Sequence, residues 1–191
     1  MADPVDIAEL EKVYAAEIVR LNRMVATALT VASIEHLYTQ LMESKFEAST
    51  EYFLMMEGVQ TGLVMSYGRL FVSSDGTTRL QEKAIPAELR AVHEELMGFR
   101  NERYAHHGRH ESKSSSVSLS PSEDGVLVNM SMEIGFWVGA SKAWAPMFIW
   151  LRQHVSERID NDLQHLSRKS GLRWHMAQGP APGWIIESAA S

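Results

Sequence analysis

Apolar side chains recur at helical spacing through the first part of the chain. From Val5 to Glu57 the sequence contains neither glycine nor proline, so no residue type there interrupts a helix. This pattern predicts one long helix over residues 6–44, or two helices with a bend near Thr30 to Ser33, and Asp6 is a suitable N-cap. The apolar positions that define it are Ile7, Leu10, Tyr14, Ile18, Leu21, Val25, Leu29, Ile34, Leu37, Tyr38 and Leu41.

A second helix is expected after the helical phase is lost near residues 44–50. Ser49 and Thr50 can cap it, and apolar residues then continue at helical spacing to Phe71. Gly58, Gly62 and Gly68 lower its helix propensity but permit a neighbouring helix to approach closely.

The central stretch, residues 85–108, combines a helical pattern with an unusual polar end. Its apolar residues follow one another at steps of four, three, four and three, which places them on one helical face. Pro86 suits the first turn of a helix, and Gly108 can take the left-handed conformation that ends one. We therefore expect a helix that packs into the core. These apolar residues are Ile85, Leu89, Val92, Leu96 and Phe99.

After Gly108 the pattern changes from helical to alternating. Val117 and Leu119 alternate with serines, residues 121–125 contain turn-forming types, and Val126, Val128 and Met130 alternate again. This predicts a β-hairpin at about residues 115–135. A last long helix follows Ser141 and ends near Gly171.

Together these elements predict a mainly α protein: an antiparallel helical bundle of four to five helices with a small β-hairpin inserted before the last long helix. We expect one domain over residues 1–171 and a C-terminal tail over residues 172–191, in which Trp184, Ile185 and Ile186 can dock back onto the bundle.

Composition narrows the possible partners and chemistry. The 191 residues carry a formal net charge of −6, which argues against broad attraction to phosphate backbones, so that any contact with nucleic acid must be local. There is no cysteine, which excludes disulfides and thiol chemistry and suits a reducing compartment. Since the N-terminus shows no basic leader and no stretch reaches about 18 uncharged apolar residues, we expect a cytoplasmic protein with no membrane contact.

One chemically rich cluster lies at the end of the central helix. Arg100, Asn101, Arg103, Tyr104, His106 and His107 fall within eight positions. In the segment from Arg100 to His106, asparagine directly follows the arginine, and five residues separate the arginine from the histidine. This arrangement resembles the signature of the HEPN superfamily. These proteins are small helical bundles, and many of them are dimeric RNases. The order of elements over residues 1 to about 110, together with the final helix, is similar to the branch associated with toxins and abortive infection by phage.

The resemblance implies a metal-independent endoribonuclease of toxin or phage-defence type, with Arg100 and His106 as catalytic residues and no cofactor. Histidine can transfer a proton near neutral pH, and arginine offers a planar set of donors to a phosphate. In a continuous helix, residues six apart do not share a face, so either the helix unwinds before His106 or the working pair is assembled across a two-fold axis. The resemblance implies the second arrangement: a homodimer whose cleft, lined by two copies of the motif, binds RNA or a nucleotide. An antitoxin or another defence-system protein is a possible partner.

The remaining residues of the cluster have two interpretations each. Asn101, Arg103, Tyr104 and His107 can line the substrate groove, but an arginine at a helix end also complements the helix dipole, and a tyrosine there is commonly half-buried core. His106 and His110 would share a helical face in a metal site only if the helix continued past Gly108, so we expect no metal. The alternative function is a non-catalytic HEPN-like adaptor that binds a nucleotide or a protein.

Overall fold

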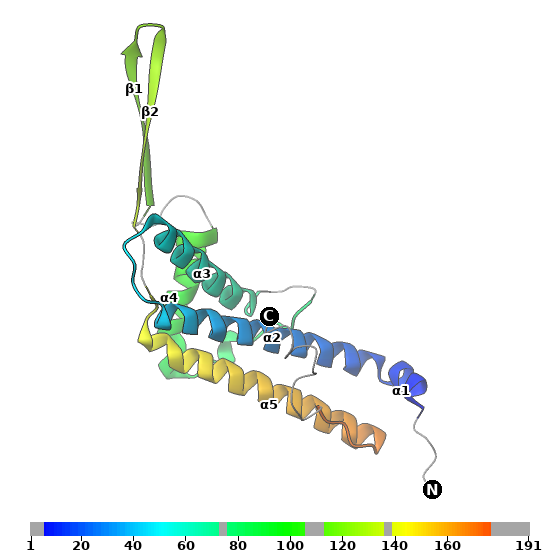
Figure 1. The fold of residues 1–191 in the computed structure, drawn as a ribbon. Helices are drawn as coiled ribbons and strands as arrows, with labels where there is room; N and C mark the ends of the chain where they lie inside the picture. Colours follow the sequence, from blue (N-terminus) through cyan, green and yellow to red (C-terminus); the bar gives the residue numbers. More distant parts are fainter. Residues whose placement is uncertain (1–5, 73–75, 106–112, 136–138, 177–191) are drawn as a thin grey trace, which may run out of the picture.

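The computed structural model describes residues 6–72, 76–105, 113–135 and 139–176 (Figure 1). It is a mainly helical protein with a two-stranded antiparallel hairpin inserted before the last long helix, as the sequence pattern predicts. The helices are α1 (Ile7–Val13), α2 (Ala15–Glu43), α3 (Thr50–Arg69), α4 (Arg90–Gly98) and α5 (Ala145–Ser170). The strands are β1 (Lys113–Ser122) and β2 (Gly125–Ile134). None of the helices in the described ranges is both long and apolar enough to cross a membrane.

The first helical region is interrupted at Tyr14, whereas the sequence pattern predicted either one continuous helix or a bend near Thr30 to Ser33. Helix α2 passes through residues 30–33 without a break. Thr30 and Ser33 each donate their hydroxyl hydrogen to the carbonyl oxygen four residues earlier, so both hydroxyls are satisfied within the helix. Tyr14 leaves the helical conformation, and its hydroxyl donates to the carbonyl oxygen of Lys169 on α5. A contact with a distant helix therefore accompanies the break. Asp6 caps α1 as expected, since its side chain accepts a hydrogen bond from the backbone N–H of Glu9.

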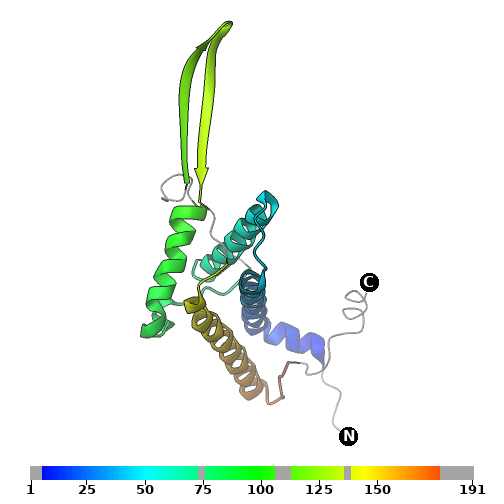
Figure 2. The ribbon, with the colours of Figure 1, turned by 60° about the vertical axis from the view of Figure 1, so that its left-hand side comes forward.

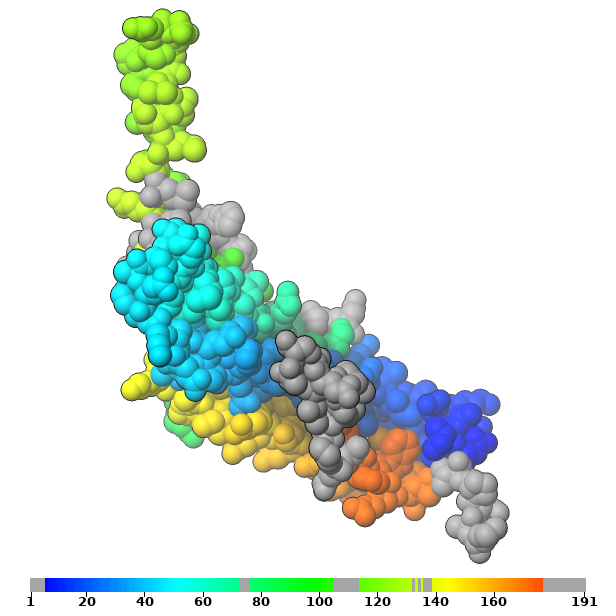
Figure 3. All heavy atoms as spheres, viewed as in Figure 1, coloured from blue at the N-terminus to red at the C-terminus, as the bar shows by residue number. Residues whose placement is uncertain are grey.

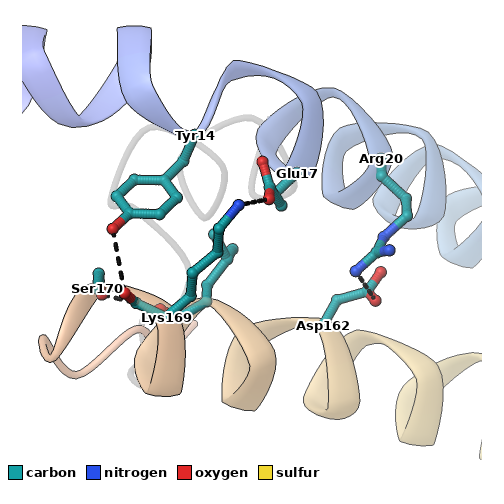
Figure 4. Close-up of polar contacts among 7 residues, drawn as sticks. Tyr14, Glu17, Arg20, Asp162, Lys169 and Ser170 are labelled. Carbon is teal, nitrogen blue, oxygen red and sulfur yellow. Dashed lines mark hydrogen bonds and ion pairs between the residues drawn. The ribbon is translucent and has the colours of Figure 1, made fainter.

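Helix α2 lies between α3 and α5, and polar pairs fasten its N-terminal end to the end of α5 (Figure 4). Arg20 contacts Asp162 at 2.8 Å between guanidinium nitrogen and carboxylate oxygen, and Lys169 forms an ion pair with Glu17. Helix α5 then ends at Gly171, whose φ of 73° is the left-handed conformation that glycine adopts without strain.

The core occupies the space between α2, α3, α4 and α5. Helix α3 begins where the sequence suggested, with Ser49 accepting a hydrogen bond from the backbone N–H of Tyr52. Trp144, in the turn before α5, is fully buried, and its ring lies 6.0 Å from that of Phe99, edge to face. The buried apolar residues include Met24, Ile34, Leu41, Leu63, Tyr67, Phe71, Leu80, Leu96, Met147, Phe148 and Leu151.

The hairpin projects away from this bundle (Figures 1 and 3). Its two strands pair without a bulge over their whole length, from Lys113 opposite Ile134 to Ser122 opposite Gly125. None of the described hairpin residues belongs to the buried core.

Candidate functional site

The residues of the sequence motif lie in a π-helical segment that continues α4. Helix α4 passes at Phe99 into a π-helix, Phe99–Ala105, whose wider turn replaces the usual helical hydrogen bonds. Segments of this kind are rare and are frequent at functional sites. Phe99 anchors the start of the segment in the core. Figure 2 shows this part of the chain running toward the base of the hairpin.

Arg100 lies directly against Gly68 of α3. A Cβ atom at position 68 would be only 2.2 Å from Cδ of Arg100 and 2.7 Å from its Nε, so a larger residue there would displace the arginine. The Arg100 Nη1 donates to Oδ1 of Asn101 at 2.8 Å. Its Nε is buried and has no hydrogen-bond partner among the described residues. Within the described chain, then, this guanidinium is held in place by packing and by a neutral amide.

Asn101 is exposed and lines a cavity of about 610 Å³ beside α4. The side of this cavity formed by α4 and the preceding turn carries both charges, because Arg90 and Lys83 lie there together with Glu82 and Glu94. Such a surface can contact a ligand that has both anionic and hydrogen-bonding groups. The other residues that line it are Ile85, His93, Met97 and Gly98.

His93 forms a buried hydrogen bond with Tyr67 of α3, with 2.7 Å between Nδ1 and the phenolic oxygen. Burial lowers the pKa of His93, while Glu82 and Glu94 act in the opposite direction, and burial also raises the pKa of the Tyr67 hydroxyl. Both groups are therefore neutral near pH 7. The hydroxyl donates to Nδ1 in the arrangement that leaves no buried phenolic hydrogen unmatched, which places the imidazole proton on Nε2.

Arg103 points into the protein. Its side chain has no exposed surface, and its Nη2 donates to the Glu57 carboxylate of α3 at 2.7 Å and to the carbonyl oxygen of Gly135 at 2.9 Å. It thus joins the π-helical segment both to α3 and to the point where the chain leaves the hairpin.

Tyr104 packs against the edge of the core, and the guanidinium of Arg103 lies 5.4 Å from the centre of its ring. Burial, followed by the negative charge of Glu57, raises the pKa of Tyr104 to about 12. Its phenol is therefore protonated at neutral pH.

His106 and His107 lie outside the described residues, as does His110. Their positions relative to Arg100 are therefore predictions from the sequence. Within the described ranges, no three or more histidine, aspartate or glutamate side chains are grouped so that they could hold a metal ion.

The structure thus brings Arg100 and Asn101 together and directs Arg103 toward Glu57. From the sequence, no role was assigned to Glu57 or to His93. Each pairs with a residue from another helix, 46 positions away for Glu57 and 26 positions away for His93. Gly68 was the sequence signal for the contact with Arg100, because a glycine there was expected to permit a neighbouring helix to approach closely.

In comparisons with known proteins, no family model, curated protein or solved structure matches the chain significantly.

Proposed function

We propose that this protein is a metal-independent endoribonuclease of toxin or phage-defence type, with Arg100 and His106 as its catalytic residues. The observation that carries the proposal is the setting of Arg100. Its side chain is fixed against Gly68, its Nη1 donates a hydrogen bond to the neutral Asn101, and its buried Nε–H has no acceptor among the described residues. An arginine that is positioned but not neutralised is suited to binding a phosphate. Arg103, three residues later, provides the contrast, because Glu57 already neutralises it.

The reaction needs only groups from the protein and the RNA. A base removes the proton of a ribose 2′-OH, the 2′ oxygen attacks the adjacent phosphorus, and the bond to the 5′ oxygen breaks. His106 acts as the base or, from a second copy, as the acid that protonates the leaving 5′ oxygen. Arg100 stabilises the negative charge that builds on the phosphate oxygens. The products are a 2′,3′-cyclic phosphate and a 5′-hydroxyl.

A composite site between two copies supplies the missing groups. One motif offers one histidine and one arginine, which are too few for acid, base and phosphate contacts together. We therefore expect a two-fold symmetric homodimer in which two motif segments face one RNA, with an interface of at least about 1,000 Å². Light scattering at micromolar concentration tests this, and a monomer would remove the composite site.

The variants Arg100→Ala and His106→Ala test the catalytic assignment. Each should abolish RNA cleavage, or cellular toxicity on expression, while the thermal midpoint changes by only a few degrees. Arg152→Ala is the matched control, because it removes the same charge from an exposed pair with Glu35 on α2. Cleavage should persist in EDTA and leave 2′,3′-cyclic phosphate ends. Products with 3′-hydroxyl ends, or loss of activity in EDTA, would contradict the mechanism.

The alternative is a non-catalytic adaptor, in which the same surface binds a nucleotide or a protein. The net charge of −6 and the cavity that Asn101 lines favour this function. Calorimetric titration with nucleotides distinguishes the endoribonuclease from the adaptor. Binding that depends on Asn101, without cleavage of any RNA tested, would favour the adaptor.

A further inference from the structure

The hairpin has one apolar face and one largely polar face, on which Leu127, opposite Ser120, is an exposed apolar exception. Residues that are directly opposite in an antiparallel pair point to the same side of the sheet. Three successive pairs on one side are therefore apolar: Val117 with Met130, Leu119 with Val128, and Pro121 with Val126. On the other side, Ser116 lies opposite Ser131 and Ser118 lies opposite Asn129, while Asn129 donates a hydrogen bond to Ser120 at 3.0 Å.

The apolar face is open to solvent. Val117, Leu119, Val126, Val128 and Met130 each expose between 56% and 83% of their surface. Figure 3 shows the hairpin standing clear of the rest of the described molecule. A two-stranded hairpin is at best marginally stable in water unless its apolar face is packed against something. An exposed apolar face that continues over three successive cross-strand pairs therefore indicates a surface that is covered in use.

The chemistry of this face fits a second copy of itself. Between the Ser115–Met132 pair and the Pro121–Val126 pair it carries no charged residue, so two such faces can meet without repulsion and without burying an unpaired charge. The two strands are equal in length and pair without a bulge, which gives a regular surface suited to face-to-face packing of two sheets. Covering the exposed apolar residues of both copies would bury on the order of 1,200 Å², the lower limit for specific, stable interfaces.

We infer that two copies of this chain associate through the apolar faces of their hairpins, which pack on each other around a two-fold axis as a small four-stranded sandwich. The inference stands on the hairpin alone and does not depend on RNA cleavage.

A pair of charge-bearing variants on opposite faces tests it. In Leu119→Glu/Val128→Lys the new charges face each other across the strands, which supports the hairpin itself but places charges in the proposed interface. Ser118→Glu/Asn129→Lys makes the same change in the neighbouring pair on the polar face. In light scattering over a dilution series from about 50 μM, we expect the wild-type protein and the polar-face variant to be dimers that dissociate at the same concentration. The apolar-face variant should dissociate at a concentration at least about tenfold higher, even where the proposed contact between motif segments persists. Helical circular dichroism should be the same for all three, since the hairpin lies outside the core.

Cysteine crosslinking gives a second measurement, which is simple to interpret because the natural chain has no cysteine. Single variants Val117→Cys, Leu119→Cys, Val128→Cys and Met130→Cys place a thiol on the apolar face, and Ser118→Cys places one on the polar face. Under mild oxidation, at least one apolar-face position should form a disulfide-linked dimer in high yield while Ser118→Cys does not. A monomeric wild-type protein, an apolar-face variant that dissociates at the same concentration as the wild-type protein, or equal crosslinking on both faces would overturn the inference.

Discussion

Two arginines three residues apart are placed very differently. Arg100 is half-buried, packs against Gly68 and donates a hydrogen bond to the neutral Asn101. Arg103 is fully buried and forms an ion pair with Glu57. Burying an arginine without a partner is costly, so the ion pair with Glu57 is what permits Arg103 to point inward. The sequence shows two arginines in one polar cluster. The packing of α3 distinguishes them, because it places Glu57 beside Arg103 and Gly68 beside Arg100.

Substituting glycines of α3 tests how tightly Arg100 is fitted. Gly58→Ala should raise the free energy of unfolding by about 0.5–1 kcal/mol, because alanine favours a helix and its Cβ has open space at position 58. Gly68→Ala should lack this gain, since its Cβ must displace the Arg100 side chain. Urea denaturation of the two variants measures the difference. An equal gain at both positions would show that Arg100 moves away without cost, and RNA cleavage by Gly68→Ala would then indicate whether its position matters.

The elements themselves were largely predictable, because each follows a local rule. Period-3.6 and period-2 patterns, with caps at Asp6, Ser49 and Gly171, predict the helices and the hairpin. The break at Tyr14 was not predictable from neighbouring residues, because it coincides with contacts to Lys169 and to Trp174, more than 150 positions away. The same limit applies to the site. Arg100 and Asn101 are adjacent in sequence, but Glu57 and Tyr67 join the surroundings of the motif only through the packing of α3 against α4 and the π-helical segment.

The hairpin should be separable from the helical bundle. Removing residues 114–133 and joining Lys113 to Ile134, which are neighbouring partners across the strands, with a short glycine-containing turn should change the free energy of unfolding by no more than about 1 kcal/mol. The reason is that the described hairpin residues contribute nothing to the core. Chemical denaturation followed by circular dichroism at 222 nm measures this. A large loss of helical stability would mean that the hairpin supports the bundle.

At the scale of the whole molecule, the bundle contains two histidines that folding keeps neutral. Burial lowers the pKa of His93 on α4 and that of His154 on α5, where the positive charge of Arg158 adds to the effect. His154 stacks on Trp150, with 5.0 Å between ring centres. Because the unfolded chain binds protons more readily at both positions, acid favours unfolding.

Stability should therefore fall as the pH is lowered through about 6.5, the ordinary histidine pKa, and the loss should continue until the folded-state pKa values are passed. His93→Gln removes one of these proton sites while keeping an acceptor for the Tyr67 hydroxyl, so its thermal midpoint should depend less on pH than that of the wild-type protein. His36→Gln, at an exposed position of α2, is the control. The same pH slope in all three proteins would contradict the assignment of His93 as a buried neutral group.

The hydrogen bond from Arg103 to the Gly135 carbonyl couples the hairpin mechanically to the π-helical segment. Each strand has ten residues, so the hairpin is about 33 Å long. Its second strand is followed by Gly135, whose carbonyl Arg103 holds. A movement of the hairpin that displaces the Gly135 carbonyl would stretch that hydrogen bond and so disturb the guanidinium that also binds Glu57. A molecule that binds the hairpin thus applies force to the Arg103–Gly135 hydrogen bond, three residues along the chain from Arg100.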